Sequence, residues 1–171
     1  LSDIYSDVYF SYIYGIGHLI RTGAIAKELS KEHDIVFIYG GPEAEKMVPI
    51  KNSEVVLLDP IYCDDEFNKY TYLYDKNIEY SHFIEKRTKI IVSAIKQHNP
   101  DLFWIEAFPF GRRKFRNEII PAINLLKSNY PQCLVCSSIR DVVFTEKPDP
   151  NHEQRIVDDL NEYFDMLFIH S

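Results

Sequence analysis

The chain has 171 residues with an ordinary globular composition, 46% hydrophobic and 26% charged, which is enough for one folded domain with its own core. Its formal net charge of −7 argues against broad nucleic-acid binding, because such binding needs a basic field. No apolar run approaches the roughly 18 residues of a membrane span, and no basic leader segment opens the sequence. We therefore expect a cytoplasmic protein with no transmembrane segment and no nucleic-acid partner, while peripheral association with a membrane stays open.

The first half of the chain alternates strand and helix patterns. Residues 8–14 are β-branched and aromatic and stop at Gly15, which predicts a strand. A helix is expected next, because its core-facing residues recur at i, i+3, i+4 and i+7 from Thr22 to Leu29. Two further strands and an irregular Tyr-rich stretch are then predicted at residues 35–39, 55–58 and 61–76.

The second half continues the alternation. A long helix carries apolar residues on one face from Tyr80 to Ile95 and is expected to end near Asn99, just before a proline. The remaining predicted elements are a strand at residues 102–105, a loop at 107–113, a helix through 119–126, a strand at 133–137, a loop at 141–150, a helix through 156–160 and a strand at 166–169.

This alternation predicts the fold class. Strands that alternate with helices favour right-handed crossovers, and near-continuous apolar strands are typical of a sheet covered on both faces. We expect residues 1–171 to form one α/β domain, a doubly wound, mostly parallel Rossmann-like sheet of about six strands with helices on both faces. Because the chain stops just after a strand, we also expect it to be part of a longer protein.

Three cysteines are present, and two of them, Cys133 and Cys136, have CxxC spacing. A redox CxxC lies at a helix N-terminus, whereas this pair lies in an apolar strand-like run, where positions three apart point to opposite faces. The sequence predicts two buried structural thiols. It contains no second Cys/His pair at zinc-site spacing, so no metal site is expected.

The residues with chemical potential follow the predicted strands. In open parallel sheets ligands bind beyond the carboxyl ends of the strands, so these residues are expected to gather at one edge. They are a glycine-rich turn with His18 after the first strand, Glu106 and a basic aromatic loop after the fourth, and Arg140 with Asp141 after the fifth.

The first turn joins a strand to a helix through Gly15 and Gly17, followed by His18. The glycines permit close backbone approach, and the helix start favours an anion. Ile20 stands where a dinucleotide fingerprint has its third glycine, which argues against NAD or FAD. His18 is a candidate general base, since a helix N-terminus favours its neutral form; a tight turn with a structural or surface histidine is the alternative.

The loop after the fourth strand contains Phe110, Arg112 and Arg113. Arginines suit bidentate contacts with phosphate or carboxylate, and the aromatics can stack on a sugar or an apolar tail. A solvated basic turn is the alternative. Glu106 is either a catalytic carboxylate or the ion-pair partner of one of these arginines, and we favour the pair. Arg140 and Asp141 are candidate binding residues or a structural ion pair.

Two groups of segments resemble a known family. The sequence GIGHLIRT at residues 15–22, followed by AIAKEL at 24–29, resembles the first loop and helix of GT-B glycosyltransferases of the MurG-like kind. The sequence EAFPFGRRKF at residues 106–115, with SIRD at 138–141 and YFD at 163–165, resembles more narrowly a bacterial group of predicted glycosyltransferases.

The resemblance implies a two-domain enzyme in which this chain is the N-terminal, acceptor-side half. A C-terminal nucleotide-binding domain would lie further along the chain or in a separate subunit, so the isolated chain is expected to be inactive. The enzyme would transfer a hexosyl or N-acetylhexosaminyl group from a sugar nucleotide to a small-molecule or lipid-linked hydroxyl acceptor, with no bound cofactor or metal. His18 matches the loop histidine, a candidate base. The implied binding residues are Gly15, Gly17, Arg21, Glu106, Phe110, Arg112, Arg113, Arg140 and Asp141.

Two other functions remain open from the sequence. A related sugar-nucleotide epimerase would be expected to bring more carboxylates to the cleft. A non-enzymatic binding domain of Rossmann type needs none of the proposed catalytic chemistry.

Overall fold

The computed structural model describes residues 5–10, 16–41, 50–51, 53–63, 70–72, 79–140 and 150–170. Two residues predicted for the site, Gly15 and Asp141, lie outside these ranges, as do residues 11–14 of the expected first strand.

The main sheet has six parallel strands in the order β3-β2-β1-β6-β7-β8. The chain first builds outward from β1 through β2 to β3 and then returns to the other side of β1 with β6, β7 and β8, which is doubly wound topology. This confirms the predicted α/β fold class. The strands are β1 (Tyr5–Phe10), β2 (Asp34–Tyr39), β3 (Ser53–Leu57), β6 (Leu102–Glu106), β7 (Leu134–Arg140) and β8 (Met166–His170).

Two local predictions differ from the structure. β1 begins at Tyr5, three residues before the expected start, because it pairs along its whole length with β2, from Tyr5 opposite Asp34 to Phe10 opposite Tyr39. The Tyr-rich stretch predicted to be irregular contains a small antiparallel sheet, β4 (Ile61–Cys63) with β5 (Tyr70–Tyr72). Both features depend on which segments pair with each other, and this pairing cannot be read from local residue composition.

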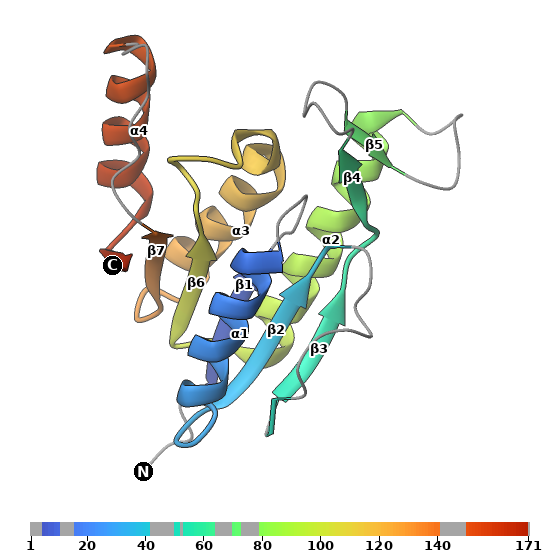
Figure 1. Ribbon diagram of the computed structural model, residues 1–171, viewed down its shortest axis with the longest axis vertical. Coiled ribbons are helices and arrows are strands. Elements are labelled where there is room, and N and C mark those ends of the chain that lie inside the picture. The colour runs from blue at the N-terminus through green and yellow to red at the C-terminus, as the bar shows by residue number, and fades with distance from the viewer. Residues whose placement is uncertain are drawn as a thin grey trace.

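Helices cover both faces of the main sheet. Figure 1 shows α1 on one face, with α2 and α3 behind the strands on the other. α4 extends past the carboxyl edge of the sheet. The helices are α1 (Ile16–Leu29), α2 (Tyr80–His98), α3 (Arg116–Asn129) and α4 (Pro150–Tyr163), and a 3-10 turn, η2 (Arg113–Phe115), precedes α3. None of the described helices is long and apolar enough to cross a membrane.

Side-chain alternation along β2 divides the core into two clusters. Ile35 and Phe37 pack on the α1 side with Trp104, whereas Val36 and Ile38 pack on the side of α2 and α3. Burial of each such side chain contributes about 1.5–3 kcal/mol, so both helical layers are held mainly by apolar contact.

The two cysteines of the CxxC segment are free, buried and on opposite sides of the sheet. Cys133 belongs to the cluster under α2 and α3, and Cys136 to the cluster under α1. Burial and the charge of Asp165 raise the pKa of Cys136 to about 11, which keeps its thiol protonated. The prediction of structural thiols is confirmed.

Candidate active site at the carboxyl edge

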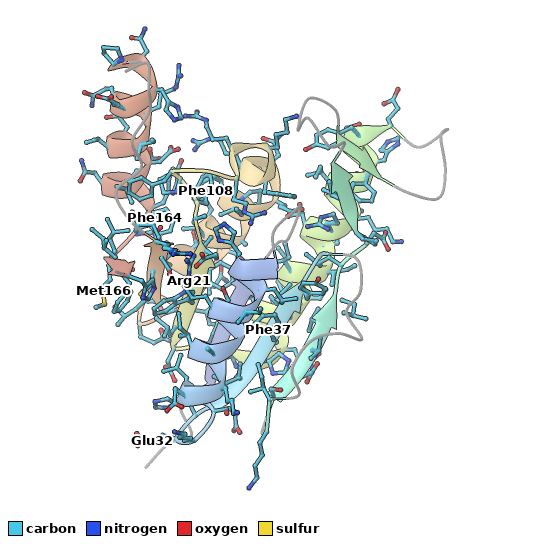
Figure 2. The ribbon with its side chains drawn as sticks, viewed as in Figure 1. Arg21, Glu32, Phe37, Phe108, Phe164 and Met166 are labelled. Carbon is cyan, nitrogen blue, oxygen red and sulfur yellow. The ribbon has the colours of Figure 1, made fainter. Side chains whose placement is uncertain are left out.

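The candidate site lies where the winding of the sheet reverses, between β1 and β6. Connections leave these two strands in opposite directions, which opens a crevice at their carboxyl ends in doubly wound folds. α1 begins after β1 and supplies His18 and Arg21. β6 ends at Glu106, and Figure 2 shows Arg21 leaving α1 on the side where β6 ends.

His18, Arg21 and Glu106 contact one another directly. The Nδ1 atom of His18 lies 3.0 Å from Oε1 of Glu106, and Arg21 donates from Nη2 to the same oxygen. His18 and Arg21 are three residues apart on α1, so the helix presents both to the strand end. Only 1% of the Glu106 side chain is exposed, against 39% for His18. A buried carboxylate therefore holds a half-exposed imidazole.

These contacts set the tautomer of His18. An ionised carboxylate only accepts hydrogen bonds, so Nδ1 carries the hydrogen that is donated to Glu106. The Nη2 atom of Arg21 is 3.2 Å from the same ring nitrogen, but both would be donors in this tautomer. The lone pair of the imidazole is consequently on Nε2, which can accept a proton.

The surroundings keep His18 neutral. Burial and the guanidinium charges of Arg112, Arg21 and Arg140 lower the pKa of His18 to about 4. The sequence analysis expected a neutral histidine because of the helix N-terminus; the structure adds desolvation and three cations as the causes. Arg21 also offsets the Glu106 charge that would otherwise favour the imidazolium.

The predicted ion pair of Glu106 exists, and the partner observed in the described part of the chain is Arg21 of α1, which the sequence analysis did not consider for this pair. The loop leaves β6 through Ala107, at φ 67°, and carries its arginines past the strand end. The second oxygen of Glu106, Oε2, is buried and has no hydrogen-bond partner among the described residues.

The loop after β6 is tightly held. Gly111 N–H donates to the Ala107 carbonyl at 2.7 Å, and the hydroxyl of Ser137 donates to the carbonyl of Phe108 at 2.6 Å. The ring of Phe108 is fully buried against Phe164, and both are labelled in Figure 2. Phe110 is only partly buried. The loop therefore presents its aromatic and basic residues from a fixed backbone.

The two adjacent loop arginines have different surroundings. Arg112 has φ 62° at the start of η2, and its charge acts on His18. Arg113 has Nη1 3.3 Å from Nδ1 of His152 in the first turn of α4. Arg140, exposed at the end of β7, also acts on His18. The structure thus associates Arg112 and Arg140 with the histidine, and Arg113 with α4.

Gly17 lies in the first turn of α1, and in the described part of the chain no atom beyond its sequence neighbours and its own helix backbone would be within 4 Å of a Cβ built there. The backbone at this position is therefore open to a ligand. Among the described residues, no group of three or more His, Cys, Asp or Glu side chains is placed to hold a metal ion.

A second histidine at this edge, His170, was not singled out by the sequence analysis. It ends β8, with Nε2 2.8 Å from Oγ of Ser138 and its ring 6.3 Å from that of Trp104. Burial and the charge of Arg21 lower the pKa of His170. The signal was present, because His170 directly follows the last apolar run.

No protein-family model matches the sequence, and no curated protein matches it. Solved structures that resemble the chain include a UDP-glucosyltransferase from Polygonum tinctorium capable of glucosylating indoxyl, in complex with 3,4-dichloroaniline, with 12% identity, a TM-score of 0.49, and coverage of 82% of this chain and 30% of that one. Another is Phytolacca americana UGT2 complexed with UDP-2-fluoro-glucose and pterostilbene, with 9% identity, a TM-score of 0.45, and coverage of 83% of this chain and 32% of that one. The chain spans just under a third of the length of each of these proteins.

Proposed function

We propose that this chain is the acceptor-binding half of a glycosyltransferase, which transfers a sugar from a sugar nucleotide to a hydroxyl acceptor. The observation that carries the proposal is a neutral histidine at the topological switch point, held through Nδ1 by a buried carboxylate. The resemblance of residues 15–29 and 106–115 to GT-B enzymes supplies the reaction class.

The chemistry needs a proton acceptor beside the attacking hydroxyl. The acceptor oxygen forms a bond to the anomeric carbon, the bond from that carbon to the donor phosphate breaks, and the nucleoside diphosphate leaves with the bonding electrons. The acceptor proton passes to Nε2 of His18. Glu106 then stabilises the imidazolium that forms, and Arg21 keeps the carboxylate oriented. Glu106 is thus a positioning residue, and His18 the proposed base.

The test uses the complete natural gene product with a panel of sugar nucleotides and hydroxyl acceptors, and measures nucleoside diphosphate release. His18→Ala should lower turnover by about 100-fold or more, the usual scale for a positioned base, with little change in acceptor affinity. The matched control is His82→Ala, because His82 is an exposed histidine on α2. The isolated 171-residue chain should not turn over, because donor binding belongs to the other half.

Three outcomes would contradict the proposal. Full activity in His18→Ala removes the base role. Conversion of a sugar nucleotide without any acceptor identifies an epimerase. Tight acceptor binding with no turnover of any donor by the complete protein favours a non-enzymatic binding domain.

A further inference from the structure

Three guanidinium groups from three different elements converge on the candidate site. Arg21 comes from α1, Arg112 from the loop after β6, and Arg140 from the end of β7. All three charges act on the same imidazole ring, that of His18. These elements surround the switch point of the sheet, so segments distant in sequence bring positive charge to one place.

The backbone explains why the arginines of β7 and α1 share a face. Ser138 is paired with Glu106, and Arg140 is two residues further along β7, so Glu106, Ser138 and Arg140 lie on the same side of the sheet. This is the side covered by α1, because Trp104 and Cys136 at the alternate positions of these strands belong to the α1 cluster. Arg21 of α1 reaches Glu106 from above that face.

The third arginine is brought to the site by the loop. Hydrogen bonds from Gly111 to Ala107 and from Ser137 to Phe108 close the loop against β7. Arg112 follows directly, and its carbonyl accepts a hydrogen bond from Phe115 N–H at 2.8 Å. The side chain of Arg112 therefore starts from a backbone that is fixed on both sides.

We propose that Arg21, Arg112 and Arg140 form a subsite for an anionic group, a phosphate or a carboxylate, carried by the acceptor next to the hydroxyl that His18 activates. The inference rests on the proposed function, in which His18 accepts the proton of an acceptor hydroxyl. It goes beyond that function by naming the class of acceptor, one that carries an anionic group. Guanidinium groups match the planar, multidentate geometry of such anions.

The subsite has a mechanistic consequence for the base. An anion bound among the arginines offsets the charges that, after burial, lower the pKa of His18. The pKa therefore rises on acceptor binding, and the base becomes stronger only when its substrate is in place. The groups that face His18 in this change are Glu106 on β6, Arg21 on α1, Arg140 on β7 and Arg112 on the loop.

The experiment measures anion binding to the complete gene product by calorimetry, and the imidazole signal of His18 by NMR with labelled histidine. The probes are glycerol 3-phosphate, propionate and neutral glycerol. Both anions should bind, and glycerol should not. Saturation of the protein with glycerol 3-phosphate should raise the pKa of His18 by about one unit or more. Arg112→Ala and Arg140→Ala should each weaken phosphate binding by about 10-fold, the scale of one charge-assisted hydrogen bond.

Lys114→Ala is the matched control, because it removes the same charge from an exposed position in η2, two residues after Arg112, and should leave binding unchanged. Thermal melting verifies that each variant is folded. Equal binding of glycerol and glycerol 3-phosphate would overturn the subsite, as would phosphate binding that is unaffected by both arginine variants. Phosphatidylcholine vesicles with and without phosphatidic acid distinguish the source of the phosphate. Tighter binding to the acidic vesicles than to soluble glycerol 3-phosphate assigns a lipid headgroup, and tighter binding to soluble glycerol 3-phosphate assigns a soluble acceptor. Both results support the subsite.

The two proposals fail separately. Arginine-dependent anion binding without turnover of any donor would support the subsite and contradict the transferase function. Equal rates of sugar transfer to neutral and to anionic acceptors would support the transferase function and contradict the subsite.

Discussion

Two ion pairs in this molecule consist of the same residue types, arginine and glutamate, but lie in different surroundings. Arg87 of α2 and Glu118 of α3 are both 0% exposed, and two guanidinium nitrogens bind the two carboxylate oxygens at 2.7 and 2.9 Å. The third nitrogen, Nη1, donates to the Asp59 carbonyl. Every polar atom of this pair is satisfied inside the core, on the face of the sheet opposite α1.

The pair also fixes the strand ends around it. The Arg87 guanidinium lies 5.8 and 5.6 Å from the ring centroids of Phe83 and Phe115. A Cβ at Gly40, just after β2, would be 2.7 Å from its Nη1 and Nη2 atoms, so any larger residue there would require the Arg87 guanidinium to shift. The connections after β2 and β3 and the start of α3 are thus held by one buried cation.

The edge pair of Arg21 and Glu106 is incomplete by comparison. Oε2 of Glu106 has no partner among the described residues, and the imidazole that shares Oε1 is 39% exposed. A fully paired, fully buried ion pair is typical of a core, whereas a buried carboxylate that shares an oxygen with a partly exposed, titratable imidazole is typical of a functional site. Substitutions in each pair should therefore affect different properties, namely stability for the buried pair and turnover for the edge pair.

The largest effect is expected from breaking the buried pair. Arg87→Met leaves the Glu118 charge buried without its counter-ion and should lower the free energy of unfolding by about 3–5 kcal/mol. Denaturant titration measures this change. The double variant Arg87→Met, Glu118→Leu removes both charges and should recover most of the loss; a double variant as unstable as the single one would contradict the assignment.

A matched pair of amide substitutions sharpens the comparison. Glu118→Gln should destabilise the fold by several kcal/mol, because Arg87 loses its buried counter-ion. Glu106→Gln should change the melting temperature little but lower turnover of the complete enzyme by about 10-fold or more, because the imidazolium loses its stabilising carboxylate. If Glu106→Gln melted as early as Glu118→Gln, the edge pair would be structural as well.

The smallest effect is a pH dependence of stability. Between about pH 6.5 and pH 4, His18 is neutral in the folded chain and protonated in the unfolded one. The unfolded state then binds more protons, so the contribution of His18 makes stability fall as the pH falls through this window, and this contribution is constant below pH 4. His18→Gln should flatten this slope slightly, since solvent screens a half-exposed ring. Denaturant midpoints across the window test it, and a steeper slope in the variant would contradict the sign.

Local sequence patterns were sufficient for several features of the fold. Periodicity predicted the doubly wound sheet, and the asparagine–proline step predicted the end of α2, where Asn99 takes the left-handed conformation with φ 48°. The apolar setting of Cys133 and Cys136 predicted buried thiols. The rule that ligands bind beyond strand ends placed His18 and Glu106 at one edge.

Only the tertiary structure decided which side chains meet. Arg21 is 85 residues from Glu106 in sequence, and Arg87 is 31 residues from Glu118. The effect of the Arg112 charge on His18 and the contact of Arg113 with His152 of α4 depend on how the loop closes against β7. Element type follows from hydrophobic period and turn residues, which are local. Ion pairs, burial and the resulting pKa depend on the packing of distant segments. The sequence by itself therefore determined the edge at which the candidate residues gather, and the fold determined which of them contact one another.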